Sequence, residues 1–182
     1  MRAGSPSRPM LLSAALAFGC SEAPAASRGA PPRYEALVEL DAWSDVTRKD
    51  DPFVTARDAA DDCVLSGFRF EPDQRWLEVD TGACNWVTLS APARYAVDVG
   101  QLVRLRVSHY DLDAAAPTTA ELRVRFGDCD AWSKSIEIPS PASVDEEELA
   151  SPCALAEGAA AFFHVHNHGQ NTYQLQALEV LR

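Results

Sequence analysis

Three of the four histidines in the chain fall within one short run, His164-Val165-His166-Asn167-His168. If Phe163 and Val165 face a hydrophobic core, the histidines project together from the opposite face of a strand, each about 7 Å from the next. Neutral imidazoles with this spacing can share a Zn²⁺ or Cu²⁺ ion. The run therefore predicts a metal site formed by His164, His166 and His168.

A structural interpretation of the same run is the commoner one for such a sequence. Asn and Gly tolerate left-handed backbone conformations and favour turns, so Asn167, Gly169 and Asn171 predict a turn at the end of a strand. His109 has the phase of the inward-facing Val107 and is expected in the core rather than at a metal. The third metal ligand would then depend on the fold.

Acidic residues gather between positions 41 and 51, at Asp41, Asp45, Asp50 and Asp51. Calcium takes six to eight oxygen ligands, several of them carboxylates, so this stretch is a candidate for one structural calcium ion. The spacing of an EF-hand loop is absent. A solvated acidic loop is the competing interpretation in a chain with a formal net charge of −11.

Aromatic residues offer a second kind of binding site. Sugars stack their apolar faces on aromatic rings while polar side chains bind the hydroxyls. Trp76 and Trp86 each alternate with apolar residues that would face the core, so both are candidates for an exposed platform, together with Tyr110. A tryptophan buried in the core is the alternative, and a shift of one residue in register would exchange the two assignments.

Catalytic signatures are missing. The chain has no G-x-S-x-G elbow, no H-E-x-x-H and no single free cysteine to pair with a histidine. Glu71, Glu78 and Asp80 could supply paired carboxylates, but the relevant separation is spatial. We therefore expect no enzymatic activity.

The N-terminus carries an export signal. Arg2 and Arg8 precede a short apolar run, Met10 to Phe18, and the stretch Ala17-Phe18-Gly19-Cys20 stands at its end. This pattern is typical of a cleaved secretory signal, and the cysteine after the small residues resembles the lipobox of bacterial lipoproteins. The resemblance implies lipidation, palmitate included, at Cys20. Ser21 after the cysteine implies the outer membrane. An ordinary signal peptide cut after Ala23 or Ala26 is the alternative.

The cysteine count agrees with a lipidated Cys20. It leaves an even number of cysteines for an exported chain, which predicts two disulfides. The four are Cys63, Cys84, Cys129 and Cys153. All three connectivities remain open.

Three regions follow from these features. Residues 1–19 form the signal, residues 20–33 an Ala/Pro/Ser-rich tether, and residues 34–182 one domain. Removal of the two signal arginines changes the formal charge from −11 to −13, which excludes nucleic acid as a partner and leaves attachment to a membrane to the lipid.

Short strands dominate the domain. Residues 102–110 and 120–126 alternate strictly between apolar and polar side chains, as half-buried strands do. Further candidates are residues 34–40, 63–70, 75–80, 85–89, 95–99, 133–138, 160–166 and 172–181. Residues 144–150 (VDEEELA) predict a short helix with Ser143 as N-cap, and residues 54–60 are a weaker helix candidate.

About ten strands, little helix and two disulfides favour an all-β, antiparallel, jelly-roll-like β-sandwich. The C-terminal stretch HNHGQNTYQLQALEVL is similar to the galactose-binding-like sandwiches of carbohydrate-binding modules. That resemblance implies carbohydrate as the ligand. The sequence thus predicts a lipid-anchored protein of the bacterial cell envelope with a binding or structural domain, for carbohydrate or an envelope protein, or alternatively for a metal ion.

Overall fold

The computed structural model describes residues 31–57, 61 and 67–182. Within these residues the chain from Pro32 onward forms one compact unit. No helix in the described part is long and apolar enough to cross a membrane.

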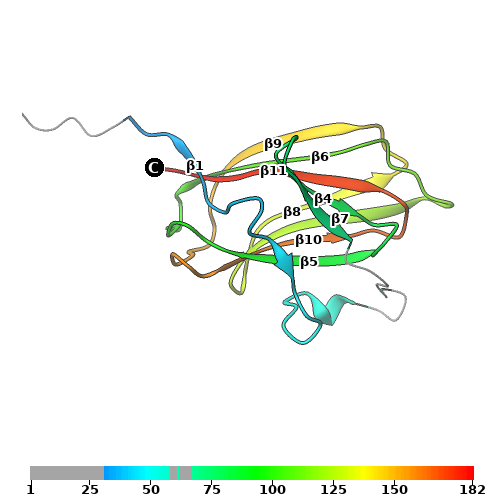
Figure 1. The fold of residues 1–182 in the computed structure, drawn as a ribbon, viewed down its shortest axis with the longest axis horizontal. Coiled ribbons are helices and arrows are strands. Elements are labelled where there is room, and N and C mark those ends of the chain that lie inside the picture. Colours follow the sequence, from blue (N-terminus) through cyan, green and yellow to red (C-terminus); the bar gives the residue numbers. More distant parts are fainter. Residues whose placement is uncertain (1–30, 58–60, 62–66) are drawn as a thin grey trace, which may run out of the picture. The chain divides into compact units, whose positions relative to one another are not determined.

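Two antiparallel sheets face each other and form a β-sandwich (Figure 1). The strands are β1 (Tyr34–Ala36), β2 (Ser44–Asp45), β3 (Phe68–Glu71), β4 (Trp76–Asp80), β5 (Trp86–Pro92), β6 (Leu102–His109), β7 (Thr118–Phe126), β8 (Cys129–Ile138), β9 (Ser143–Ala150), β10 (Ala160–His166) and β11 (Thr172–Leu181). One sheet has the order β3-β4-β11-β6-β9, with β1 also paired to β11, and the other has the order β2-β5-β10-β7-β8. The all-β sandwich expected from the sequence is confirmed.

The core lies between the sheets and consists of the apolar residues that alternate along each strand. The six-stranded sheet contributes Leu77, Val79, Val103, Leu105, Val107, Leu175, Leu178 and Val180. The five-stranded sheet contributes Val87, Leu89, Leu122, Val124, Phe126, Phe163 and Val165. Alternation with period two therefore predicts the inward faces correctly.

The segment expected to be a helix is the edge strand β9. Its residues pair with β6 throughout, for example Glu147 with Leu105. Asp145 and Glu147 point between the sheets at their open side, where Lys134 Nζ lies 2.5 Å from Asp145 and Trp132 Nε1 donates to Glu147 over 2.9 Å. The capping pattern is overridden because these partners on β8 satisfy the acids, and inward charges also protect an edge from further pairing.

Two other expectations need correction. Residues 95–99 do not form a strand; Val97 makes only an isolated bridge to Leu155. Of the second helix candidate, only Val54–Ala56 forms a short 3₁₀ turn, η1, and residues 58–60 lie outside the described residues.

One of the two predicted disulfides is described. Cys129, at the start of β8, is bonded to Cys153 in the segment between β9 and β10, with their Cα atoms 5.9 Å apart. Cys84 is also disulfide-bonded. Cys63 and Cys20 lie outside the described residues.

Candidate metal centre

Strand β10 places the histidines as its alternation requires. Phe163 and Val165 are in the core, so His164 and His166 project from the outer face of the five-stranded sheet. His168 follows in the turn between β10 and β11. The three histidines differ in their surroundings: His164 is 2% exposed, whereas the side chains of His166 and His168 are 23% and 41% exposed.

His164 is buried beneath the segment that contains η1. The ring of Phe53 stacks on its imidazole with 4.5 Å between centroids, and His164 Nδ1 lies 2.8 Å from the Thr88 hydroxyl. Burial, with a smaller contribution from His166, lowers the pKa of His164 to about 3. His164 is therefore a neutral packing residue, and the structure does not bring it to a shared site with the other two histidines.

Trp86 lies on the same outer face and is covered by the same segment. Its indole N–H donates to Asp51 Oδ2 over 2.8 Å, and the other carboxylate oxygen of Asp51 accepts the Phe53 backbone N–H. The guanidinium groups of Arg123 and Arg125 lie over the Phe53 ring. Trp86 has the outward phase that the sequence predicts, but at 3% exposure it offers no platform for a ligand.

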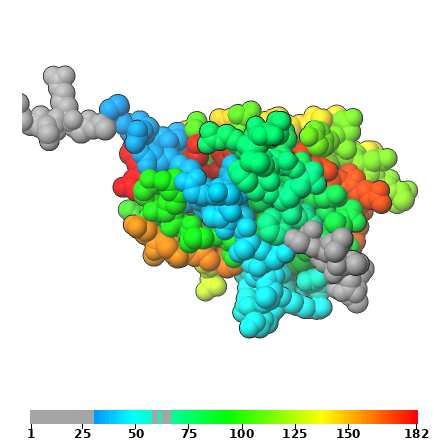
Figure 2. All heavy atoms as spheres, viewed as in Figure 1, coloured from blue at the N-terminus to red at the C-terminus, as the bar shows by residue number. Residues whose placement is uncertain are grey.

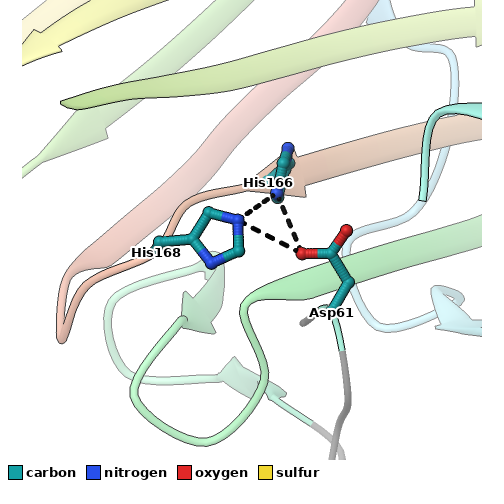
Figure 3. A group of neighbouring side chains, drawn as sticks. All are labelled: Asp61, His166 and His168. Atoms are coloured by element: carbon teal, nitrogen blue, oxygen red, sulfur yellow. Dashed lines mark hydrogen bonds and ion pairs between the residues drawn. The ribbon is translucent and has the colours of Figure 1, made fainter. Parts of the chain in front are cut away.

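Asp61 takes the place that the sequence assigned to His164 (Figure 3). Its Oδ1 lies 3.1 Å from His166 Nε2 and 3.4 Å from His168 Nε2, and these two nitrogens are 3.1 Å apart. Among the described residues, these side chains form the one group of three or more His, Cys, Asp or Glu ligands able to hold a metal ion. Two of the three predicted histidines are thus brought together.

Neighbouring groups hold two of these ligands in place. The Arg57 guanidinium donates to the backbone carbonyl of Asp61, with Nε at 2.8 Å. The side-chain amide of Asn85 lies 3.0 Å from His168 Nδ1. With the amide oxygen turned toward the ring, Nδ1–H would donate to it and leave the Nε2 lone pair free for a metal, which is the usual outer-shell arrangement of a histidine ligand.

Sequence reasoning missed Asp61 because no local pattern points to it. The residue is 105 positions from His166 in the chain and belongs to a segment with no periodic pattern. Its buried carboxylate is the only unusual feature, and burial of an isolated aspartate is not visible in a sequence.

The four aspartates proposed for calcium do not converge in this way. Asp41, Asp45 and Asp50 are exposed, and Asp50 accepts a hydrogen bond from Thr47. Asp51 is buried and uses both carboxylate oxygens on Trp86 and Phe53. No ligand cluster forms among these four described residues.

The remaining aromatic candidates lie elsewhere. Tyr110, just after β6, is 55% exposed, and Trp76 in β4 is partly buried. A separate groove of about 390 Å³ lies along β11, where Phe70 and several polar side chains line it; the lining includes Glu39, Asp41, Arg75, Gln176 and Glu179. Figure 2 shows part of the surface formed by residues 31–45 (blue) and the β3–β4 hairpin (green).

Comparison with known proteins identifies no family. No family model and no curated protein matches the sequence. Among solved structures, the arabinose-bound α-L-arabinofuranosidase MgGH51 aligns with 80% of this chain at 11% identity and a TM-score of 0.47, and the chain spans 25% of its length.

Two more of these structures are carbohydrate complexes. TmCBM61 with β-1,4-galactotriose aligns with 84% of this chain and 88% of its own at 10% identity and a TM-score of 0.34. The CBM22-1–GH10 modules of Clostridium thermocellum xylanase 10B, complexed with xylohexaose, align with 82% of this chain and 28% of their own chain. The identity is 11% and the TM-score is 0.37.

Proposed function

We propose that this chain is an exported, lipid-anchored envelope protein whose β-sandwich binds one metal ion. Zn²⁺ is the preferred candidate, and Cu²⁺ is the alternative. Asp61, His166 and His168 supply the ligands. One observation carries the proposal: the three donor atoms form a triangle with sides of 3.1, 3.1 and 3.4 Å.

That triangle fits a tetrahedral ion. Zinc–nitrogen and zinc–oxygen bonds of about 2.0–2.1 Å at tetrahedral angles place neighbouring ligand atoms about 3.3 Å apart. Two imidazoles and one carboxylate are ligands that suit zinc and copper. The competing interpretation is a cluster without metal, in which hydrogen bonds connect the Asp61 carboxylate and the two imidazoles.

Metal binding by matched variants tests the proposal. Protein purified without a histidine tag should take up about one equivalent of Zn²⁺ in a calorimetric titration. His166→Ala and His168→Ala should each weaken binding at least 100-fold, since each removes one of three ligands. His164→Phe, which keeps an aromatic ring against Phe53, should bind Zn²⁺ like the wild type.

Equal affinity in the wild type and in the His166 and His168 variants would contradict the proposed site. Loss of binding in His164→Phe with an unchanged melting temperature would also contradict it.

The proposed location rests on the export signal and is tested separately. Mature wild type extracted from membranes should begin at Cys20 and carry added acyl mass, which Cys20→Ser should lack; a wild-type chain that begins at Cys20 without added acyl mass would contradict a lipid anchor.

A second candidate function is carbohydrate binding in the β11 groove. The groove has the size of a small ligand site and combines an aromatic ring, a guanidinium, an amide and carboxylates. Arg75 on its rim has a positive φ of 56°, a left-handed conformation that is uncommon outside glycine. Binding of the wild type to a glycan array, lost in Phe70→Ala and Arg75→Ala, would support this function, and a blank array would exclude it for the glycans tested.

A further inference from the structure

The turn that carries His168 is fixed on both sides of that residue. Before it, the backbone N–H of Asn167 donates to the backbone carbonyl of Asn85 over 3.0 Å. After it, the carbonyl of Gly169 accepts a hydrogen bond of 2.6 Å from the Thr81 hydroxyl. The side-chain amide of Asn85 also lies 3.0 Å from the Nδ1 atom of the His168 ring. The turn therefore determines where this imidazole can lie.

Thr81, directly after β4, is the centre of these contacts and is 4% exposed. Besides donating to Gly169, its hydroxyl oxygen accepts the side-chain amide of Asn167 over 3.2 Å and the backbone N–H of Asn171 over 3.1 Å. One donated and two accepted hydrogen bonds are the full capacity of a hydroxyl group. This single group thus connects three residues of the turn to the end of β4.

The loop after β6 fixes the same turn from another direction. The buried side-chain amide of Asn171 accepts the backbone N–H of Asp113 over 2.9 Å and donates to the Asp113 carbonyl over 3.1 Å. Gly169 packs closely against this pair. A Cβ atom at Gly169 would lie 2.7 Å from Asn171 Nδ2 and 3.0 Å from the Asp113 carbonyl oxygen. The turn consequently has no room to move toward this loop.

A fixed turn affects which ion the site can hold. A given set of ligands usually binds Cu²⁺ more tightly than Zn²⁺. Cu²⁺ prefers strong ligands in one plane, where any three include an opposite pair about 4 Å apart for bonds of about 2.0 Å. The donor atoms of Asp61, His166 and His168 are 3.1, 3.1 and 3.4 Å apart, so no such pair exists. Cu²⁺ can take only two of these ligands into its plane, whereas tetrahedral Zn²⁺ takes all three.

We infer that the fixed turn makes the metal site selective for Zn²⁺ over Cu²⁺ and that Thr81 is the residue that determines this selectivity. With the turn released, His168 could move into the plane of a copper ion, and the usual preference for copper would return. His166 lacks this freedom because β10 pairs it with Trp86 on one side and with Glu121 on the other. The inference rests on the proposed function and names the ion that the site discriminates against.

Competition with a chromophoric chelator measures the Zn²⁺ and Cu²⁺ affinities of the untagged wild type and its variants. Thr81→Val nearly keeps the shape of the side chain but removes the hydroxyl. It should shift the ratio of Cu²⁺ to Zn²⁺ affinity toward copper about tenfold, an effect of the size expected for a lost contact outside the ligands. Thr81→Ser keeps the hydroxyl and should retain the wild-type ratio.

Two further variants accompany this pair. Ser151→Ala is the matched control, because it removes a buried hydroxyl that donates to the Cys153 carbonyl beside the start of β6, whereas the turn adjoins the end of β6. It should leave the ratio unchanged. Gly169→Ala tests the turn without Thr81, since its added methyl group must displace the turn. It should shift the ratio toward copper, also where Thr81→Val fails to fold.

The possible results separate the two claims. No binding of either ion, or equal binding by the wild type and His166→Ala, would overturn the proposed function itself. Zn²⁺ binding at the site with one common ratio in the wild type, Thr81→Val and Gly169→Ala would keep the metal site and overturn the selectivity. A shift in Thr81→Ser or Ser151→Ala as large as that in Thr81→Val would overturn the role of the Thr81 hydroxyl.

Discussion

At the scale of single residues, the buried imidazole of His164 couples stability to pH. Its pKa is about 3 in the folded protein and close to 6.5 in an unfolded chain. Between these values the unfolded state binds a proton that the folded state does not. The contribution of neutral His164 is therefore fully present above pH 6.5 and is lost as the pH falls toward 3.

The expected result is a pH-dependent difference between two proteins. Urea unfolding of the wild type from pH 7 to pH 4 should show a free energy of unfolding that falls more steeply than that of His164→Phe. The extra slope should approach 1.4 kcal/mol per pH unit at most, roughly the effect of one proton. Parallel curves for the two proteins would show that His164 is not buried in its neutral form.

Two neighbouring aspartates give a matched pair for the second prediction. Asp51 is buried and accepts hydrogen bonds from Trp86 and Phe53, whereas Asp50 is exposed. Asp51→Ala should lower the free energy of unfolding by about 1–3 kcal/mol, because two buried N–H groups lose their acceptor. Asp50→Ala should change it by less than about 0.5 kcal/mol. Similar losses in both, measured by urea unfolding, would contradict the burial of Asp51.

At the scale of elements, the alternation of apolar and polar residues predicted the strands well. It did not predict which loop segments pack over their outer faces. The outward orientation of Trp86 follows from the core residues Val87 and Leu89 on its strand, and that of His166 follows from Phe163 and Val165. Both side chains do lie on the outer face of the sheet. The burial of Trp86 could not be predicted, because it depends on Asp51 and Arg57 in a segment that lacks periodicity. The approach of Asp61 to His166 depends on the same kind of long-range packing.

The assignment of residues 144–150 failed for a different physical reason. Its acidic residues and N-cap favour a helix locally, but pairing with β6 and partners on β8 stabilise a strand. Secondary-structure propensity is a weak preference that tertiary contacts override. Nothing in the segment itself shows that Lys134 and Trp132 lie opposite it.

Hydrogen exchange tests the strand. In an edge strand every second amide points to its neighbour and the others point away from the sheet. Amides of Ser143–Ala150 should therefore alternate between slow and fast exchange in NMR measurements. Uniformly slow exchange over consecutive residues would instead indicate the helix that the sequence suggests.

At the scale of the whole molecule, the Cys129–Cys153 disulfide connects the two sheets' neighbouring edges through the segment after β9. It closes a loop of 24 residues in the chain, which corresponds to about 3 kcal/mol from restriction of the unfolded state. Cys129→Ser/Cys153→Ser should lower the free energy of unfolding by roughly this amount in non-reducing urea titrations. A loss below about 1 kcal/mol would show that the bond constrains little.

The last strand gives the domain two different ends. Arg33, where the chain enters the domain, exchanges backbone hydrogen bonds of 2.8 and 2.9 Å with Arg182. The opposite end of β11 follows the turn that carries His168, and a strand of ten residues spans roughly 30 Å (Figure 1). In the anchored form that we propose, the tether (residues 20–33) therefore joins the domain at the end opposite His166 and His168. The metal-bearing end is thus the end of the domain that lies farther from Arg33, the point at which the chain enters it.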